Sequence, residues 1–263
     1  MSPERAPQRA FLAVSALVFT ISAATTIVWG MTMSAMGEMS MPGGWSMSMT
    51  WMRMPGQSSL GAAASFLAMW VVMMVAMMLP ALVPMLGRYR QAVSGMGEPR
   101  LARLTAVVGI GYFGVWTMLG IVAFPLGIGL AEAAMQRPAL ARAVPLAVGV
   151  IVLLAGALQF TAWKARHLAG CRNSPPRDRA LPADFGTAWR HGLRLGLHCI
   201  QCCAGLMAIL LVIGVMDLRA MTVVAAAITV ERLAPAGERI ARALGTVVVA
   251  VGLGLIARAM GLG

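Results

Sequence analysis

Residues 60–86 read LGAAASFLAMWVVMMVAMMLPALVPML, an uncharged apolar run that decides the fold class of this chain. A helix needs about 20 apolar residues to cross the hydrocarbon core of a bilayer, and this run exceeds that length. The chain of 263 residues is 59% apolar and 11% charged, whereas soluble domains are roughly half apolar and a quarter charged. We therefore expect an all-α, polytopic membrane helix bundle, with residues 1–263 forming a single integral membrane domain.

Similar apolar runs recur along the rest of the chain and predict six or seven transmembrane helices in all. Their ranges are 11–30, 60–86, 104–130, 143–163, 195–216, 220–230 and 243–256. The last two runs are short for complete spans at about 1.5 Å per residue, which leaves the count at six or seven.

Basic residues set the expected orientation of these spans. With the N-terminus inside, the inner segments carry 16 of the 21 Lys and Arg residues and the outer segments carry five. Lys and Arg accumulate on the cytoplasmic side of membrane proteins. We expect a multi-pass protein of a bacterial inner membrane with a cytoplasmic N-terminus. Because the basic residues are scattered through the connections and line no single face, nucleic acid is not expected as a partner, despite the net charge of +12.

A methionine-rich segment separates the first two spans. Residues 31–54 read MTMSAMGEMSMPGGWSMSMTWMRM and contain nine methionines. The orientation places this loop, residues 31–58, outside the membrane. A thioether is a soft, uncharged ligand that suits Cu(I). We interpret the loop as a copper collector, and the alternative is a flexible amphipathic linker that lies on the lipid surface.

Three of the four cysteines of the chain, Cys199, Cys202 and Cys203, fall within five residues at the start of the fifth predicted span. At about 100° per residue they share one helical arc with His198, and with His191 one heptad earlier. Disulfides within the helix are disfavoured, because such Cβ atoms lie about 5–6 Å apart and the cytoplasm is reducing. Thiolate ligation of Cu(I), with Zn(II) as the alternative ion, is one interpretation. The other is that the cysteines pack as small apolar residues at a helix interface.

The remaining cysteine, Cys171, follows His167 by four residues after the fourth predicted span. If that helix continues into the cytoplasm, both side chains share one face at the same membrane surface as the other cysteines. The pair could then complete a His/Cys metal site. The alternative is a basic helix end whose side chains extend toward water.

Methionines also follow one face of the second predicted span. Met69, Met73 and Met77 recur every four residues, and Met78 lies in a second row beside them. This stripe could relay Cu(I) from the outer loop to the inner thiols. Methionine also fills irregular gaps between helices well, so packing is the alternative interpretation.

The same segments make the chain similar to a bacterial family of predicted metal-binding integral membrane proteins of unknown function. The residues that carry the resemblance are Trp70, Met73, Met74, Ala76, Met77, Met78, Pro80, Gln159, Trp163, Lys164, His167, Leu168, Cys171, Arg172, Gly192, Gly196, Cys199, Cys202, Cys203, Leu206, Met207, Gly214, Met216, Glu231 and Arg232. In that family an aromatic residue often precedes the first cysteine and follows the last. This chain has His198 and Ala204 there, which implies an altered ligand set. The resemblance implies membrane location and metal binding, and it implies no reaction.

These features predict a copper-handling inner-membrane protein that binds or translocates a soft metal between the outer loop and the inner cysteines. The lipid bilayer surrounds it, and a copper chaperone or another membrane protein would be its partner. Two alternatives stay open: an assembly or thiol-redox partner, and a copper-dependent metalloenzyme subunit. The sequence contains no phosphate-binding loop, nucleophile elbow or His-Glu-x-x-His motif, so a role without catalysis is favoured.

Overall fold

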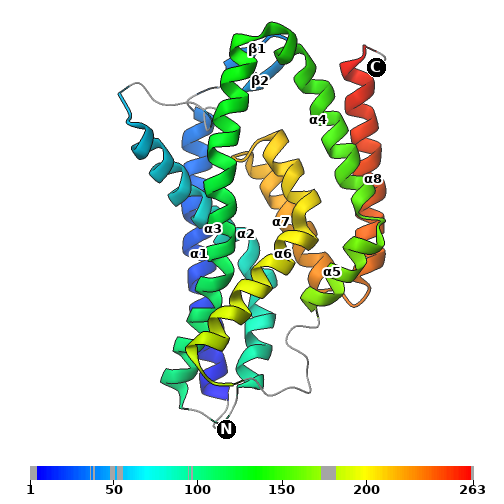
Figure 1. Ribbon diagram of the computed structural model, residues 1–263. Coiled ribbons are helices and arrows are strands. Elements are labelled where there is room, and N and C mark those ends of the chain that lie inside the picture. Colours follow the sequence, from blue (N-terminus) through cyan, green and yellow to red (C-terminus); the bar gives the residue numbers. More distant parts are fainter. Residues whose placement is uncertain are drawn as a thin grey trace.

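The structure is a computed structural model that describes residues 5–35, 37, 39–47, 51, 56–93, 95, 97–172 and 182–261. Within these ranges the chain forms an elongated helical bundle with one small hairpin (Figure 1). The helices are α1 (Arg5–Ala35), α2 (Ser59–Ala92), α3 (Glu98–Gln136), α4 (Pro138–Leu158), α5 (Ala162–Arg172), α6 (Phe185–Ile213), α7 (Leu218–Leu233) and α8 (Gly237–Ala259). The strands are β1 (Met39–Met41) and β2 (Trp45–Met47), which pair antiparallel. The expected all-α bundle is confirmed.

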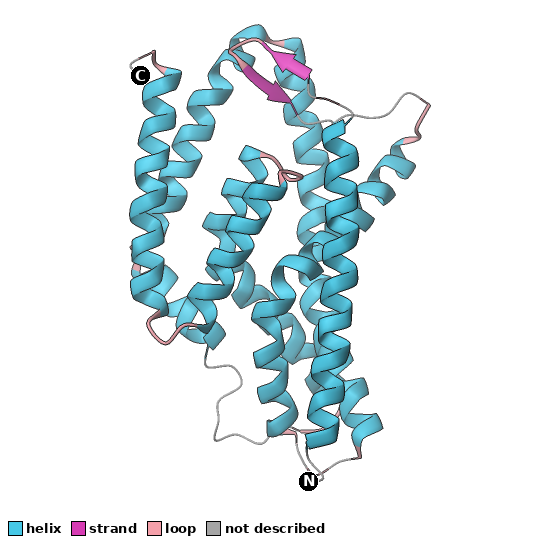
Figure 2. Cartoon of the chain, turned by 180° about the vertical axis from the view of Figure 1, so that it is seen from behind, coloured by secondary structure: helices cyan, strands magenta, loops and turns pink. Residues whose placement is uncertain are grey.

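Six helices of the described chain are long and apolar enough to cross a membrane: α1, α2, α3, α4, α6 and α8. Their number agrees with the lower of the two expected counts. The start of α1 and the end of α8 lie at opposite ends of the bundle, and the hairpin lies at the end where α8 finishes (Figure 2). The hairpin packs at the junction of α3 and α4, and the orientation predicted from the basic residues would put this end of the bundle outside.

The structure corrects the boundaries of the fourth predicted span. That span was expected over residues 143–163, but α4 covers Pro138–Leu158 and the chain then turns. Pro138 fits at the first helical position, where its missing N–H costs nothing. The Thr161 side chain accepts a hydrogen bond from the Lys164 N–H at 3.2 Å and so begins the separate helix α5. The fourth helix therefore does not simply continue toward Cys171.

Helix α7 is too short for a complete span. Its 16 residues extend about 24 Å at 1.5 Å per residue, against a hydrocarbon core of about 30 Å. It returns from α6 through Gly214, whose φ of +148° favours glycine. The Asp217 carboxylate then caps α7 by accepting hydrogen bonds from the N–H groups of Arg219 and Ala220, at 2.8 and 2.9 Å. The α6–α7 pair thus forms a helical hairpin inside the bundle.

Close contact between α3 and α6 depends on glycines. A Cβ atom at Gly192 would collide with the Val108 carbonyl group, and one at Gly196 would lie 2.9 Å from the Tyr112 carbonyl oxygen. Small residues spaced in this way let membrane helices approach closely. The contact brings Tyr112 of α3 beside the cysteines that follow Gly196 on α6.

Helix α2 lies at the centre of the bundle, whereas α1 lies at its edge. In their most apolar windows, 56% of the α2 residues are buried and only 6% of the α1 residues are buried. The indole N–H of Trp70 on α2 donates to the Trp116 carbonyl of α3 at 2.9 Å. Helix α2 therefore carries its methionines through the protein interior, while most of α1 stays exposed at the edge of the bundle.

Candidate metal centre

Three thiols on α6 form the core of the candidate site. Cys199, Cys202 and Cys203 are buried, and their sulfur atoms all lie within 4.8 Å of one another. The Sγ atoms of Cys199 and Cys203 are 3.8 Å apart, and those of Cys202 and Cys203 are 3.5 Å apart. The sequence predicted that these three cysteines share one helical face, and in the structure that face is buried in the core.

A fourth thiol reaches this group from another helix. The Sγ atom of Cys171 on α5 lies 3.3 Å from that of Cys202, and Cys171 is fully buried. Its hydrogen bond with Cys202, together with burial, raises the pKa of the Cys171 thiol well above its usual value. We call Cys171, Cys199, Cys202 and Cys203 the thiol cluster. All four cysteines are free thiols, so every cysteine of the chain belongs to one site.

Cys199 has further partners on three other helices. The Met78 thioether of α2 lies 4.0 Å from its sulfur, and the Tyr112 hydroxyl of α3 donates to that sulfur at 2.9 Å. The Arg232 guanidinium of α7 donates to the same sulfur at 3.0 Å and to the Met85 sulfur at 3.0 Å. Charge-assisted hydrogen bonds of this kind stabilise a negatively charged sulfur. The Cys199 sulfur thus accepts two hydrogen bonds, one of them from a positively charged group.

An ionic layer borders the thiol cluster and is formed by Gln159, Lys164 and Glu231. The Lys164 ammonium donates to the Glu231 carboxylate at 2.7 Å and also to the Cys202 carbonyl. The Gln159 amide donates to the other Glu231 oxygen at 3.0 Å. Lys164 and Glu231 are only 4% and 1% exposed, and breaking such a buried pair costs about 3–5 kcal/mol. The layer therefore fixes α4, α5, α6 and α7 around the thiols.

The two candidate histidines lie together, outside the group of mutually close thiols. His198 is exposed, and its Nδ1 atom is 2.7 Å from the Arg194 carbonyl oxygen. Its ring centroid lies 6.2 Å from that of His167, which is half-buried and packs on Trp163. The arc predicted on α6 is therefore only partly buried. Neighbouring helices cover its cysteines but leave His198 exposed. Ligation by these histidines remains a hypothesis.

The candidate methionines of α2 all lie in the core. Met69, Met73, Met77 and Met78 are buried. Met78 is the member of this set with a sulfur contact to the thiol cluster. The other three continue from it along α2 toward the end of the bundle that carries the hairpin, so the stripe leads away from the cluster along one helix. Burial suits both packing and a copper path.

The predicted methionine loop starts later than expected, because residues 31–35 still belong to α1, and the β1–β2 hairpin then follows. Met39 pairs with Met47, and Met41 lies two residues along the same strand, so three thioethers share one face. Met41 and Met47 are buried against Ala131, Ala134 and Ala141, while Met39 is 40% exposed. The Trp45 indole donates to the Ala141 carbonyl at 2.9 Å and anchors the hairpin. Loop residues 36, 38, 48–50 and 52–55 lie outside the described residues.

Sequence reasoning did not place the polar partners of the thiols. Arg232 and Tyr112 contact Cys199, and Met85 contacts Arg232. An Arg beside a Glu at the end of an apolar segment was a usable signal, because ionisable groups at membrane depth usually serve function. Tyr112 and Met85 gave no such signal, since each reads as an ordinary core residue.

A family model described as PpoB2, copper chaperone, matches residues 67–255. No curated protein and no solved structure matches the chain. The matched range contains the thiol cluster, the ionic layer and the α2 methionines, and it begins after the hairpin.

Proposed function

Because this chain belongs to the PpoB2 copper chaperone family, we propose that it carries Cu(I) as cargo in the thiol cluster. The observation that supports this most directly is the cluster itself, in which four thiols from α5 and α6 meet in the core of a membrane bundle. The family match includes these residues and leaves out the hairpin. The copper function therefore resides first in the inner thiols and only secondarily in the outer loop.

The donor set suits a soft monovalent ion. Thiolates and a thioether are the ligands that select Cu(I), and they surround Cys199. The charges support the same choice. Lys164 and Glu231 cancel each other, which leaves Arg232 as the uncompensated cation of the described site. Cu(I) with two thiolates carries one negative charge, which Arg232 neutralises, whereas Zn(II) with four thiolates would leave one buried negative charge without a partner.

A route to this site from the outer side runs along α2. From Met69 to Met77 the buried methionines cover about 12 Å of helix at 1.5 Å per residue, and Met78 then contacts Cys199. In the proposed route, the exposed methionine of the hairpin and its neighbours collect Cu(I), the α2 thioethers relay it, and the thiols receive it. Neutral thioethers bind Cu(I) more weakly than thiolates do, so affinity rises toward the cytoplasmic end.

Removal of the thiols tests this proposal. The full chain, purified in detergent and loaded anaerobically with Cu(I), should bind copper, and Cys199→Ser, Cys202→Ser, Cys203→Ser together should abolish that binding. A hydroxyl is nearly isosteric with the thiol but is a poor soft ligand. Elemental analysis gives the copper content, and gel filtration shows whether the variant is folded. Leu197→Ala is the exposed control on the same helix and should bind copper as the unmodified chain does. Unchanged copper content in the triple variant would contradict the proposal.

One contact favours a second candidate function, thiol redox exchange. Cys171 and Cys202 come from different helices and their sulfur atoms are 3.3 Å apart. Mass spectrometry of alkylated protein after mild oxidation distinguishes the two functions. A disulfide between Cys171 and Cys202 that forms and reduces reversibly in metal-free protein, with no copper bound in the reduced state, would favour redox exchange.

A further inference from the structure

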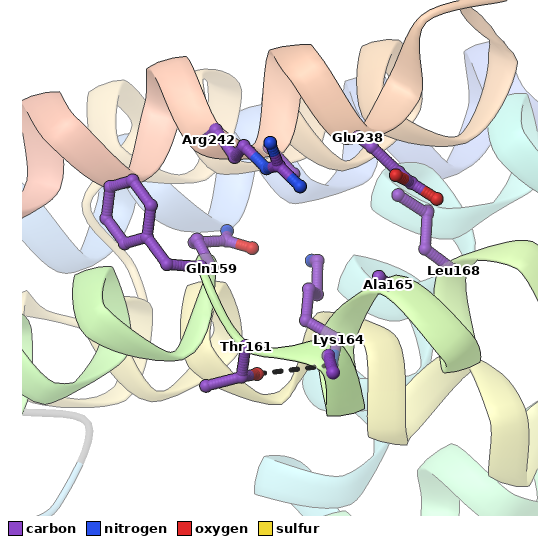
Figure 3. Close-up of a pocket in the computed structure, with 10 residues that line it drawn as sticks. Gln159, Thr161, Lys164, Ala165, Leu168, Glu238 and Arg242 are labelled. Atoms are coloured by element: carbon purple, nitrogen blue, oxygen red, sulfur yellow. Dashed lines mark hydrogen bonds between the residues drawn. The ribbon is translucent and has the colours of Figure 1, made fainter.

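A recess opens beside the ionic layer at the inner end of the bundle. It has a volume of about 240 Å³ and lies between the α4–α5 connection and the first turns of α8 (Figure 3). Buried Gln159, Lys164 and Leu168 line its floor, and exposed Glu238 and Arg242 line its rim. The charge asymmetry of the chain puts this end on the cytoplasmic side. The recess therefore connects the cytoplasm with the layer that borders the thiols.

Gln159 presents an unused acceptor to this recess. Its amide nitrogen donates to Glu231. Because a carboxylate accepts hydrogen bonds, this contact fixes the amide orientation and turns Oε1 away from Glu231. Oε1 is buried without a hydrogen-bond partner among the described residues, and Gln159 as a whole is only 5% exposed. Figure 3 shows the carboxamide directed into the space between Arg242 and Lys164. A buried acceptor is unfavourable unless a donor meets it, so this point suits a ligand with an N–H group.

The rim charges specify more of that ligand. Arg242 offers a guanidinium group, which binds carboxylates through paired hydrogen bonds. Glu238, one turn earlier on α8, offers a carboxylate to a cationic group. An ammonium group between Glu238 and the Gln159 oxygen, with a carboxylate beside Arg242, satisfies all three. A phosphate would meet the Glu238 charge unfavourably. The arrangement is complementary to the zwitterion of an α-amino acid.

We propose that the recess binds a small thiol that carries an α-amino-acid zwitterion, and that this thiol exchanges Cu(I) with the thiol cluster. The exchange rests on the proposed copper function, whereas zwitterion binding rests on the recess alone. Lys164 lies between the two sites, because it lines the recess and bonds the Cys202 carbonyl. Its side chain must move for the exchange.

The exchange is a ligand substitution at constant oxidation state. A Cu–S bond to a protein sulfur breaks, and a Cu–S bond to the incoming sulfur forms. The proton that the incoming thiol loses passes to the protein thiolate that is released. Copper stays Cu(I), so neither an oxidant nor a reductant is needed.

Calorimetric titration of the metal-free, detergent-solubilised full chain tests zwitterion binding. S-methylcysteine and S-methylglutathione carry the headgroup with the sulfur blocked, and they separate a free amino acid from a peptide source. We expect saturable binding of at least one of them, one molecule per chain, weakened at least tenfold by Arg242→Gln or Glu238→Gln. Arg239→Gln changes an exposed neighbour on α8 that does not line this recess, and it should bind as the unmodified chain does. No saturable binding of either probe, or unchanged affinity in Arg242→Gln, overturns the proposal.

Copper release tests the exchange separately. Chain loaded with Cu(I) is mixed with cysteine or glutathione, and a coloured Cu(I) chelator that cannot enter the recess traps the copper released. Arg242→Gln should hold as much copper as the unmodified chain but release it at least tenfold more slowly. Equal release rates overturn the exchange. If the chain binds no Cu(I), the proposed function and the exchange are both overturned. The titration with the S-methyl probes still tests whether the recess binds the zwitterion.

Discussion

At the scale of single residues, Arg232 is the side chain whose role is most specific. It is buried on α7 and donates to Cys199, to the Tyr112 hydroxyl and to the Met85 sulfur. Its charge has no carboxylate partner among the salt bridges of the described residues. A negatively charged copper–thiolate group would be its natural counterion.

We therefore predict that Arg232→Gln weakens Cu(I) binding at least tenfold, about 1.4 kcal/mol. The amide keeps part of the hydrogen bonding but removes the charge that neutralises the bound complex. Arg232→Lys keeps the charge and should recover most of the affinity. Competition with a Cu(I) chelator of known strength measures the difference, and Arg219→Gln, outside the site, is the control. Equal affinity in Arg232→Gln and the unmodified chain would show that the charge does not act on the metal.

Single residues also show where sequence reasoning stops. The spacing of Cys199, Cys202 and Cys203 was enough to predict one shared face, because helical geometry alone decides it. His198 falls on the same arc yet is exposed, because the edge of a buried face depends on which neighbours cover it. The helices that cover this part of α6 are α3 and α5, which are separate segments of the sequence.

At the scale of secondary-structure elements, the methionine face of α2 makes a clear prediction. Met69→Leu, Met73→Leu and Met77→Leu together should keep the fold, since such swaps usually cost under about 1.5 kcal/mol each. They remove every thioether of the row but leave its volume. If α2 relays copper, Cu(I) uptake into proteoliposomes should fall severalfold at equal protein content.

The control for that variant is Met118→Leu, which changes an exposed methionine of α3. It should transport copper as the unmodified chain does. Normal uptake by the triple α2 variant would leave packing as the explanation of the stripe. The hairpin and the thiol cluster would then need another connection or would serve separate purposes.

Elements differ in how far the sequence predicts them. Long uncharged runs predicted the apolar helices, because lipid demands internally bonded backbone over a fixed length. The break between α4 and α5 was missed. Lys164 lies just after an apolar run, so the sequence alone is compatible with a side chain that extends toward water. Its burial depends on Glu231, 67 residues away.

At the scale of the whole molecule, sidedness is the prediction on which the direction of transport depends. All four native cysteines are buried, so an introduced surface thiol should react alone. Ser46→Cys in the hairpin should react with a membrane-impermeant maleimide in intact cells, because the charge asymmetry places the hairpin outside. Ala236→Cys, between α7 and α8, should react only after lysis. The reverse labelling pattern would invert the orientation and end the proposal of inward transport.

The overall arrangement was predictable only in outline. Charge distribution gave the expected orientation, and apolar runs gave the spans, since both act through local composition. The pairing of helices was not predictable from those signals. It depends on close contacts such as Gly192 against Val108 and on the ionic layer, which link segments that are distant in the sequence.

The short helix α7 also bears on how the protein is built during synthesis. Its 16 residues are too few to settle across the bilayer unaided, and its end carries Glu231 and Arg232. Both charges find their partners on α3, α4, α5 and α6, all of which are made earlier in the chain. We expect α7 to enter the membrane only together with α6, against helices already inserted. The ribosome would thus complete the part of the protein that holds the thiol cluster before it makes the last helix, α8.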